Sequence, residues 1–150
     1  MEAGASWQFI LLVVLIGMSA FFSASETALM SLSKIRIRHM VEERVRGAEA
    51  VSKLVEKPSK LLGSILVGNN VVNIGASALA TSLALHYFGS AGVGIATALM
   101  TIIVLIFGEI TPKSLAAQHS EFISLKLVKV VGFFVVIFSP LVTVLLAFTN

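Results

Sequence analysis

The chain has 150 residues, of which 57% are hydrophobic and only 13% are charged, and its formal net charge is +3. Its mean hydropathy of +0.97 is far above that of a soluble domain and indicates a membrane protein. Cysteine is absent, which excludes disulfides, thiolate metal sites and a cysteine nucleophile.

The basic residues are unevenly distributed along the chain. Eight of the eleven Lys and Arg residues lie between Lys34 and Lys60, and none precedes Lys34 or falls between Lys60 and Lys113. Because cytoplasmic loops of membrane proteins are enriched in Lys and Arg, residues 34–60 are predicted to be cytoplasmic. The N-terminus is therefore predicted to lie outside, in a multi-pass protein of the inner or plasma membrane.

Residues 8–33 form the first predicted span. A long apolar run follows Trp7, an aromatic residue suited to the membrane interface, and about 20 such residues are enough to cross a bilayer. A secretory signal peptide is the competing interpretation, because small residues follow the apolar run. It is disfavoured because no basic residue precedes the run and because Glu26 lies within the small-residue part.

Residues 34–60 are the only markedly hydrophilic segment. Their apolar residues recur at spacings of three and four, which predicts one or two short amphipathic helices broken near Gly47: Val41, Val45, Ala48, Val51 and Val55. A solvated helical loop is the simplest interpretation, and contact with lipid headgroups or a nucleotide is the alternative. The glutamates mixed into the segment argue against nucleic acid as a partner.

Two further spans are predicted at residues 61–88 and 93–111, joined on the outer side by the uncharged turn 89–92. Small residues at 75–80 and 92–98 predict helix-packing surfaces. The last helical segment, at about 122–148, contains Pro140 and has Lys129 near the start of its apolar run. It either crosses the membrane once more or lies as a bent helix near the interface.

Polar residues interrupt the first and second spans. Their spacing predicts one polar helix face in each span, namely Ser19, Ser23 and Glu26 with Ser25 beside them, and Asn70 and Asn73 with Asn69 one turn from Asn73. Helix packing is the alternative role for the serines, and interhelical hydrogen bonding is the alternative for the asparagines. For Glu26 the alternative to ion binding is a structural role, in which its carboxyl group is neutral or hydrogen-bonded to the backbone.

Glu109 ends the third span and is the strongest candidate for a functional residue, because an ionisable side chain at membrane depth is energetically costly. Pro112 has no N–H, so the carbonyl of Gly108 loses its helical donor, and Thr111 is expected to leave helical angles. Carboxylate, amide, hydroxyl and carbonyl oxygens suit a hard cation such as Mg²⁺, Ca²⁺ or Na⁺. They do not suit Zn²⁺ or Cu⁺.

The sequences SASETA at residues 23–28, LVGNNVVN at 66–73 and GEITPK at 108–113 resemble the signatures of one family. It is the transmembrane domain of the CorC/CorB and CNNM Mg²⁺ transporters, and the resemblance covers essentially the whole chain. It implies an all-α membrane protein with three transmembrane helices per subunit, short cytoplasmic amphipathic helices and a kinked C-terminal helix associated with the membrane. It also implies a single domain over residues 1–150, with the cytosolic CBS and CorC-type domains absent.

The same resemblance implies a homodimer in the lipid bilayer that exports Mg²⁺ in exchange for Na⁺. Carried over by motif, the Mg²⁺ ligands are Ser23, Ser25, Asn70, Gly108 and Glu109. Further residues are expected to support the site or to hold Na⁺, namely Ser19, Glu26, Asn69, Asn73 and Pro112. ATP binding is not expected here, because the family places it in the CBS domains.

The predicted mechanism is alternating access through a cation site near mid-membrane. A membrane anchor that senses Mg²⁺ and regulates other transporters without conducting is the alternative. An intramembrane enzyme is disfavoured, because Glu26 and Glu109 have no accompanying nucleophile–base pattern or metal-binding histidine pair. The chain is therefore expected not to be an enzyme.

Overall fold

The computed structural model describes residues 2–149, and the chain forms helices and no strand over that range. A 3₁₀ turn, η1, and a π-helical segment, η2, interrupt the α-helices. In chain order the elements are α1 (Glu2–Ser31), α2 (Lys34–Glu42), α3 (Ala48–Val55), α4 (Pro58–Phe88), η1 (Gly89–Ala91), α5 (Gly92–Ile103), η2 (Val104–Ile110), α6 (Thr111–Gln118) and α7 (Ser120–Thr149).

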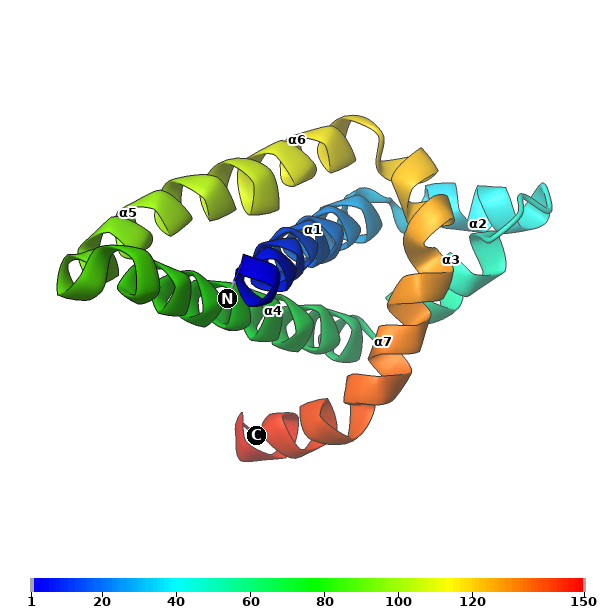
Figure 1. Cartoon of the computed structure of the whole chain (residues 1–150). Helices are drawn as coiled ribbons and strands as arrows, with labels where there is room; N and C mark the ends of the chain where they lie inside the picture. The colour runs from blue at the N-terminus through cyan, green and yellow to red at the C-terminus, as the bar shows by residue number, and fades with distance from the viewer. Residues whose placement is uncertain (1, 150) are drawn as a thin grey trace.

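Three helical stretches are long and apolar enough to cross a membrane, namely Ser6–Ser31, Pro58–Gln118 and Ser120–Thr149. The second stretch reverses at η1, so that α4 and the continuous α5–η2–α6 leg run side by side in opposite directions (Figure 1). Helix α1 packs between these two legs. The prediction of an all-helical membrane fold is confirmed.

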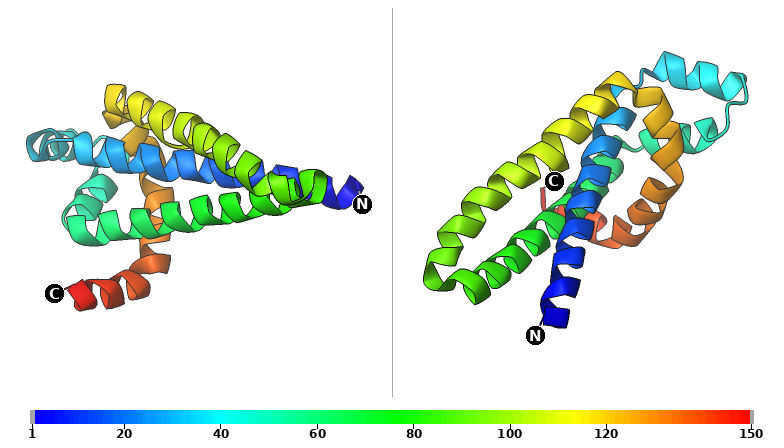
Figure 2. Two further views of the ribbon diagram at one scale, coloured as in Figure 1. Left: turned by 90° about the vertical axis from the view of Figure 1, so that its left-hand side faces the viewer. Right: turned by 45° about the horizontal axis from the view of Figure 1, so that its top comes forward.

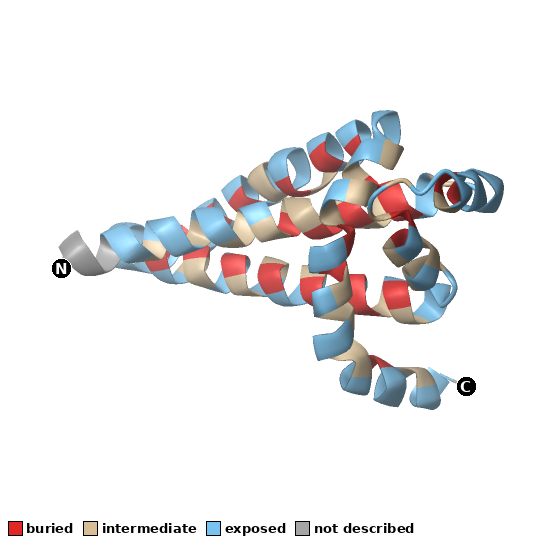
Figure 3. Cartoon of the chain, turned by 90° about the vertical axis from the view of Figure 1, so that its right-hand side faces the viewer, coloured by how far each residue is buried: buried red, intermediate tan, exposed pale blue. Residues whose placement is uncertain are grey.

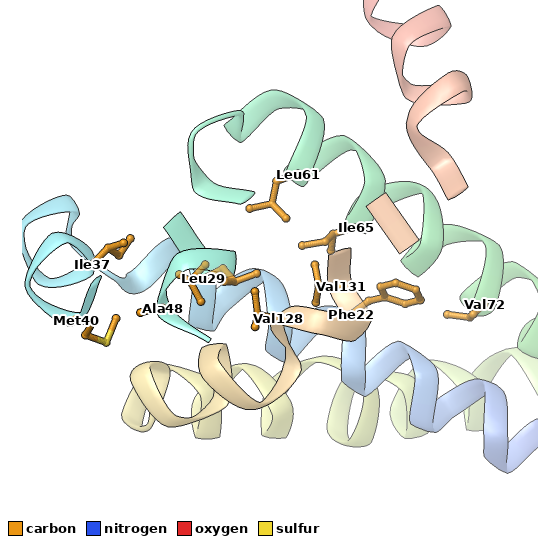
Figure 4. Close-up of a cluster of buried hydrophobic side chains, with 11 residues drawn as sticks. Phe22, Leu29, Ile37, Met40, Ala48, Leu61, Ile65, Val72, Val128 and Val131 are labelled. Atoms are coloured by element: carbon orange, nitrogen blue, oxygen red, sulfur yellow. The ribbon is translucent and has the colours of Figure 1, made fainter. Parts of the chain in front are cut away.

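Buried side chains lie on the inner faces of the helices, and most of the outer surface stays exposed (Figure 3). This distribution is expected for helices whose outer faces contact lipid, because lipid tails are as apolar as the side chains they meet. The largest buried cluster joins α1, α2, α3, α4 and α7 and includes Phe22, Leu29, Met40 and Leu61 (Figure 4).

The hydrophilic segment forms two helices, α2 and α3, as the spacing of its apolar residues predicts. Ala48 and Val51 are buried in the main cluster, and Val41 and Val45 pack against it. The break between the helices falls at Gly47, whose φ of +90° lies in the left-handed region that favours glycine. The amphipathic pattern therefore serves to attach this segment to the end of the bundle.

Helix α7 runs across α1 and α4 instead of alongside them (Figure 2) and bends in its C-terminal half, where Pro140 lies inside the helix. Only 11% of its most apolar window is fully buried, although Phe134, Val135 and Phe138 pack partly buried against the main cluster. A helix that crosses upright spans lies close to the membrane plane, so this placement favours the interfacial alternative for α7. At its start, Glu121 accepts two hydrogen bonds from Arg36, at 2.7 and 3.0 Å.

The α4–α5 hairpin closes through a contact between backbones. Gly92 is buried, and a Cβ atom at this position would lie against the carbonyl oxygen of Ala84 and 2.6 Å from the carbonyl carbon. Gly94, two residues later, is exposed and has no neighbour within 4 Å of such a Cβ atom. The two glycines of the same helix therefore have different roles in this structure.

We expect Gly92→Ala to destabilise the folded chain by about 1–3 kcal/mol, because the added methyl group must push the backbones of α4 and α5 apart. Gly94→Ala is the matched control, and we expect it to be neutral or slightly stabilising because alanine favours the helix. Thermal unfolding in detergent measures both. Equal midpoints for the two variants would contradict the close backbone contact.

Candidate metal site

The serine face of α1 is fully enclosed. Ser19, Ser23 and Ser25 are each no more than 1% exposed. Ser25 donates its hydroxyl proton to the carbonyl of Phe21 in its own helix at 2.7 Å. In the part of the chain described, 2–149, the Ser23 hydroxyl has no hydrogen-bond partner. Buried polar atoms are normally satisfied, so Ser23 is the serine whose oxygen is best placed to serve a bound ion.

Ser19 connects α1 to the asparagines of α4. Its hydroxyl donates to Oδ1 of Asn69 at 3.2 Å, and the amide nitrogen of Asn73 donates to the same oxygen at 3.4 Å. The Oδ1 atom of Asn73 is buried and has no partner among the described residues. Asn70 lies on the exposed side of α4. The structure therefore brings Asn69 and Asn73 towards the serine face and leaves Asn70 outside this cluster.

Gly108 brings the third span against the same serine. It is buried in η2, and a Cβ atom on it would lie 2.9 Å from the Ser19 hydroxyl oxygen. A side chain at this position would displace the Ser19 hydroxyl. Ser19 is thus in direct contact with the second and third spans through Asn69 and Gly108.

The expectation that Thr111 leaves helical angles is wrong. Thr111 has φ −64° and ψ −48°, and its N–H donates to the carbonyl of Ile106, five residues earlier. This π-type turn takes up one extra residue and keeps the helix continuous. Pro112 then falls in the first turn of α6, where a missing N–H does not break the helix.

Glu109 is half-buried and lines a groove of about 340 Å³ between α4 and the α5–η2 leg. Four hydroxyl side chains line the same groove, namely Ser77, Thr81, Thr97 and Thr101. None of these four residues was predicted from the sequence as part of a site. Their signal was the four-residue spacing of hydroxyls on both arms of the hairpin, which continues the spacing from Asn73 along α4.

The threonines of this groove present oxygen lone pairs to it. Thr81, Thr97 and Thr101 donate their hydroxyl protons to the carbonyls four residues earlier in their own helices, at 2.6–2.9 Å. A hydroxyl whose proton is used in this way can only accept a further contact. The groove therefore offers acceptor oxygens beside the Glu109 carboxylate.

The residues of the site suit a hard cation, and few of the ligands they offer are charged. No cluster of three or more His, Asp or Glu residues occurs within residues 2–149. Glu26 is half-buried on α1, and Glu109 is the single acidic residue between Pro58 and Gln118. Any ion held here would be bound by one or two carboxylates and several neutral oxygens, which is the ligand type of Mg²⁺, Ca²⁺ and Na⁺.

These features define an all-helical, multi-pass membrane domain with polar residues of three helices joined at one buried serine. Comparison with known proteins gives its family. The chain belongs to the CNNM family, whose model, described as the Cyclin M transmembrane N-terminal domain, matches residues 10–150.

Curated relatives share this part of the chain. A UPF0053 protein of Haemophilus influenzae is 46% identical over 142 residues, which are 95% of this chain and 34% of that protein. The UPF0053 inner membrane protein YfjD of Escherichia coli is 48% identical over 103 residues, which are 69% of this chain and 24% of that protein. The chain spans about a third or less of the length of these relatives. The resemblance seen in the three sequence motifs is confirmed.

The Ser19–Asn69 contact is testable by a double-mutant cycle on the free energy of unfolding in detergent. We expect Ser19→Ala and Asn69→Ala to show a coupling energy of about 0.6 kcal/mol, the average for hydrogen bonds between membrane helices. The cycle of Ser19→Ala with Asn70→Ala is the control, and its coupling should be close to zero because Asn70 is exposed. A coupling to Asn70 as large as that to Asn69 would contradict the observed arrangement.

Proposed function

We propose that this chain is the membrane domain of a transporter that exports Mg²⁺ in exchange for Na⁺. The observation that carries the proposal is the meeting of three spans at Ser19, which contacts Asn69 of α4 and Gly108 of η2. The polar side chains that meet here, Ser19, Asn69 and Asn73, offer hydroxyl and amide oxygens, and one carboxylate, Glu109, directly follows Gly108 in the chain. Membership of the CNNM family supports the choice of Mg²⁺ among hard cations.

Mg²⁺ requires about six oxygens in near-octahedral positions, so a site with one carboxylate needs several neutral ligands. In our proposal Glu109 supplies the charge, and Ser23 and the Gly108 carbonyl supply neutral oxygens. Ser25 and Asn70 are the remaining ligands carried over from the family. The Ser25 hydroxyl donates its proton to the carbonyl of Phe21, and its oxygen keeps lone pairs that could bind an ion. Asn70 is exposed, so an ion would have to reach it from the outer side of α4.

Transport in this proposal follows alternating access. Na⁺ bound near Glu26 would lower the affinity for Mg²⁺ and release it to the other side of the membrane. The protein would lie in the inner or plasma membrane with its N-terminus outside and with α2 and α3 on the cytoplasmic side, as the distribution of basic residues predicts. It would act without enzymatic chemistry and without binding ATP in this domain.

We propose further that two copies of the chain form the transporter. Gly94 and Ala98 on α5 are exposed small residues, and such residues allow helices of two subunits to approach closely in a membrane. The α4–α5 groove beside Glu109 opens near this face. A homodimer would therefore enclose polar side chains that one copy leaves open.

The proposed site predicts that Glu109→Gln abolishes stabilisation of the chain by Mg²⁺. Removing the charge of Glu109, the chain neighbour of Gly108, should weaken binding by more than about tenfold, since the neutral side chain no longer offsets ion dehydration. Glu49→Gln is the control, because Glu49 is exposed in the first turn of α3. Thermal unfolding with increasing MgCl₂ measures both variants.

The same two variants, with Asn70→Ala, should be measured for Mg²⁺ flux from liposomes under a Na⁺ gradient. Wild-type flux by both Glu109→Gln and Asn70→Ala would refute the site assignment. If the wild-type protein binds Mg²⁺ but gives no flux, the regulatory membrane sensor becomes the better explanation.

Pro112→Ala provides a separate prediction. The substitution restores an N–H that can bond to a carbonyl of the π-turn, that of Gly108 in the α-helical register or that of Phe107 in the π register, and that carbonyl would then be less available to an ion. We expect Mg²⁺ affinity to fall severalfold while Glu109 stays in place. Pro140→Ala is the matched control, because this proline lies inside α7, away from the site. Unchanged affinity in Pro112→Ala would show that the proline has no role in binding.

A further inference from the structure

A second cavity lies at the C-terminal end of α1, where the first span ends and the second begins. It has a volume of about 680 Å³ and is formed by the end of α1, by α2 and α3, and by the start of α4. Its lining begins at Leu29 and Met30, next to the end of the first span at Ser31, and reaches Pro58, the first residue of α4. The cavity is therefore at the boundary between the membrane and the hydrophilic segment.

The floor of this cavity is apolar. Leu29 of α1 and Ile37 of α2 line it and are otherwise buried in the main cluster (both are labelled in Figure 4), and Val41 and Val55 line it as well. On α4 the apolar surface continues into the span, because Leu62 and Leu66 follow Pro58 at four-residue spacing and are 36% and 60% exposed. A ligand that extended from the cavity along α4 would meet hydrocarbon side chains at the depth of the lipid tails.

The rim of the cavity carries two cations, Lys34 and Arg38. Neither forms an ion pair or a side-chain hydrogen bond within residues 2–149, and both are exposed. Arg36, between them in the sequence, is already paired with Glu121. Glu56 also lines the cavity, so the rim has a net charge of +1.

We infer that this cavity binds the headgroup of an anionic phospholipid, with Lys34 and Arg38 holding the phosphate and the α4 surface accommodating an acyl chain. Basic pockets between membrane helices are suited to such headgroups. The apolar floor and the exposed Leu62–Leu66 surface favour a lipid over a free phosphate ion, which has no use for them. Hydroxyl groups on the headgroup, as in phosphatidylglycerol, would donate to Glu56.

The test is native mass spectrometry of the chain titrated with phosphatidylglycerol and, separately, with phosphatidylcholine. We expect the wild-type chain to prefer phosphatidylglycerol. The double variant Lys34→Gln/Arg38→Gln should weaken phosphatidylglycerol binding roughly 25-fold, at about fivefold for each cation near the membrane surface. Inorganic phosphate at millimolar concentration should not displace the lipid.

The matched control is Arg46→Gln/Lys53→Gln, which removes the same charge from exposed residues of the same segment that do not line the cavity. We expect it to bind within about twofold of wild type. An equal loss in both double variants would show diffuse attraction and overturn the proposal. So would displacement by phosphate, or a wild-type chain that does not distinguish the two lipids. Thermal unfolding of both variants confirms that they fold.

Discussion

The close approach of η2 to α1 at Gly108 is the contact on which the candidate site depends. Inside a bilayer no water satisfies polar groups, so hydroxyl and amide groups must find partners within the protein. Gly108 has no side chain, and this lets the third span approach Ser19, while the Ser19 hydroxyl donates to Asn69 on the second. One buried serine therefore links the three spans, and a larger residue at 108 would displace its hydroxyl group.

The π-turn explains how this approach is compatible with a proline. An extra residue in the turn changes which side chains face each neighbour, and it places Gly108 against α1 while Glu109 lines the groove between α4 and α5. Pro112 is then buried in the first turn of α6 without breaking the helix. Gly108 therefore contacts α1, while the next residue, Glu109, lines the α4–α5 groove. In our proposal this turn is where the ion is bound.

The hydrophilic segment has a separate physical role at the end of the bundle. Its apolar residues pack into the cluster around Leu29 and Leu61, and its basic residues divide between two environments. Arg36 binds Glu121 of α7, and the bonded carboxylate raises the pKa of the Arg36 guanidinium. Lys34 and Arg38 stay unpaired within the described residues, at the rim of the cavity. One cation of this segment therefore pairs with the start of α7, and two others remain for a ligand.

The sequence by itself determined the helical membrane fold, the turn at residues 89–92 and the oxygen-only character of the polar groups, because hydropathy, helix periodicity and residue chemistry are local properties. It also identified Ser19, Ser23, Gly108 and Glu109 as candidates. Only the tertiary structure decided that Asn69 meets Ser19 and that Asn70 is exposed, since neighbouring positions on a helix differ by about 100° and contacts depend on how the helices pack. The π-turn, the crossing of α7 and the hydroxyl-lined groove likewise arise from contacts between segments distant in the chain, which local patterns do not specify.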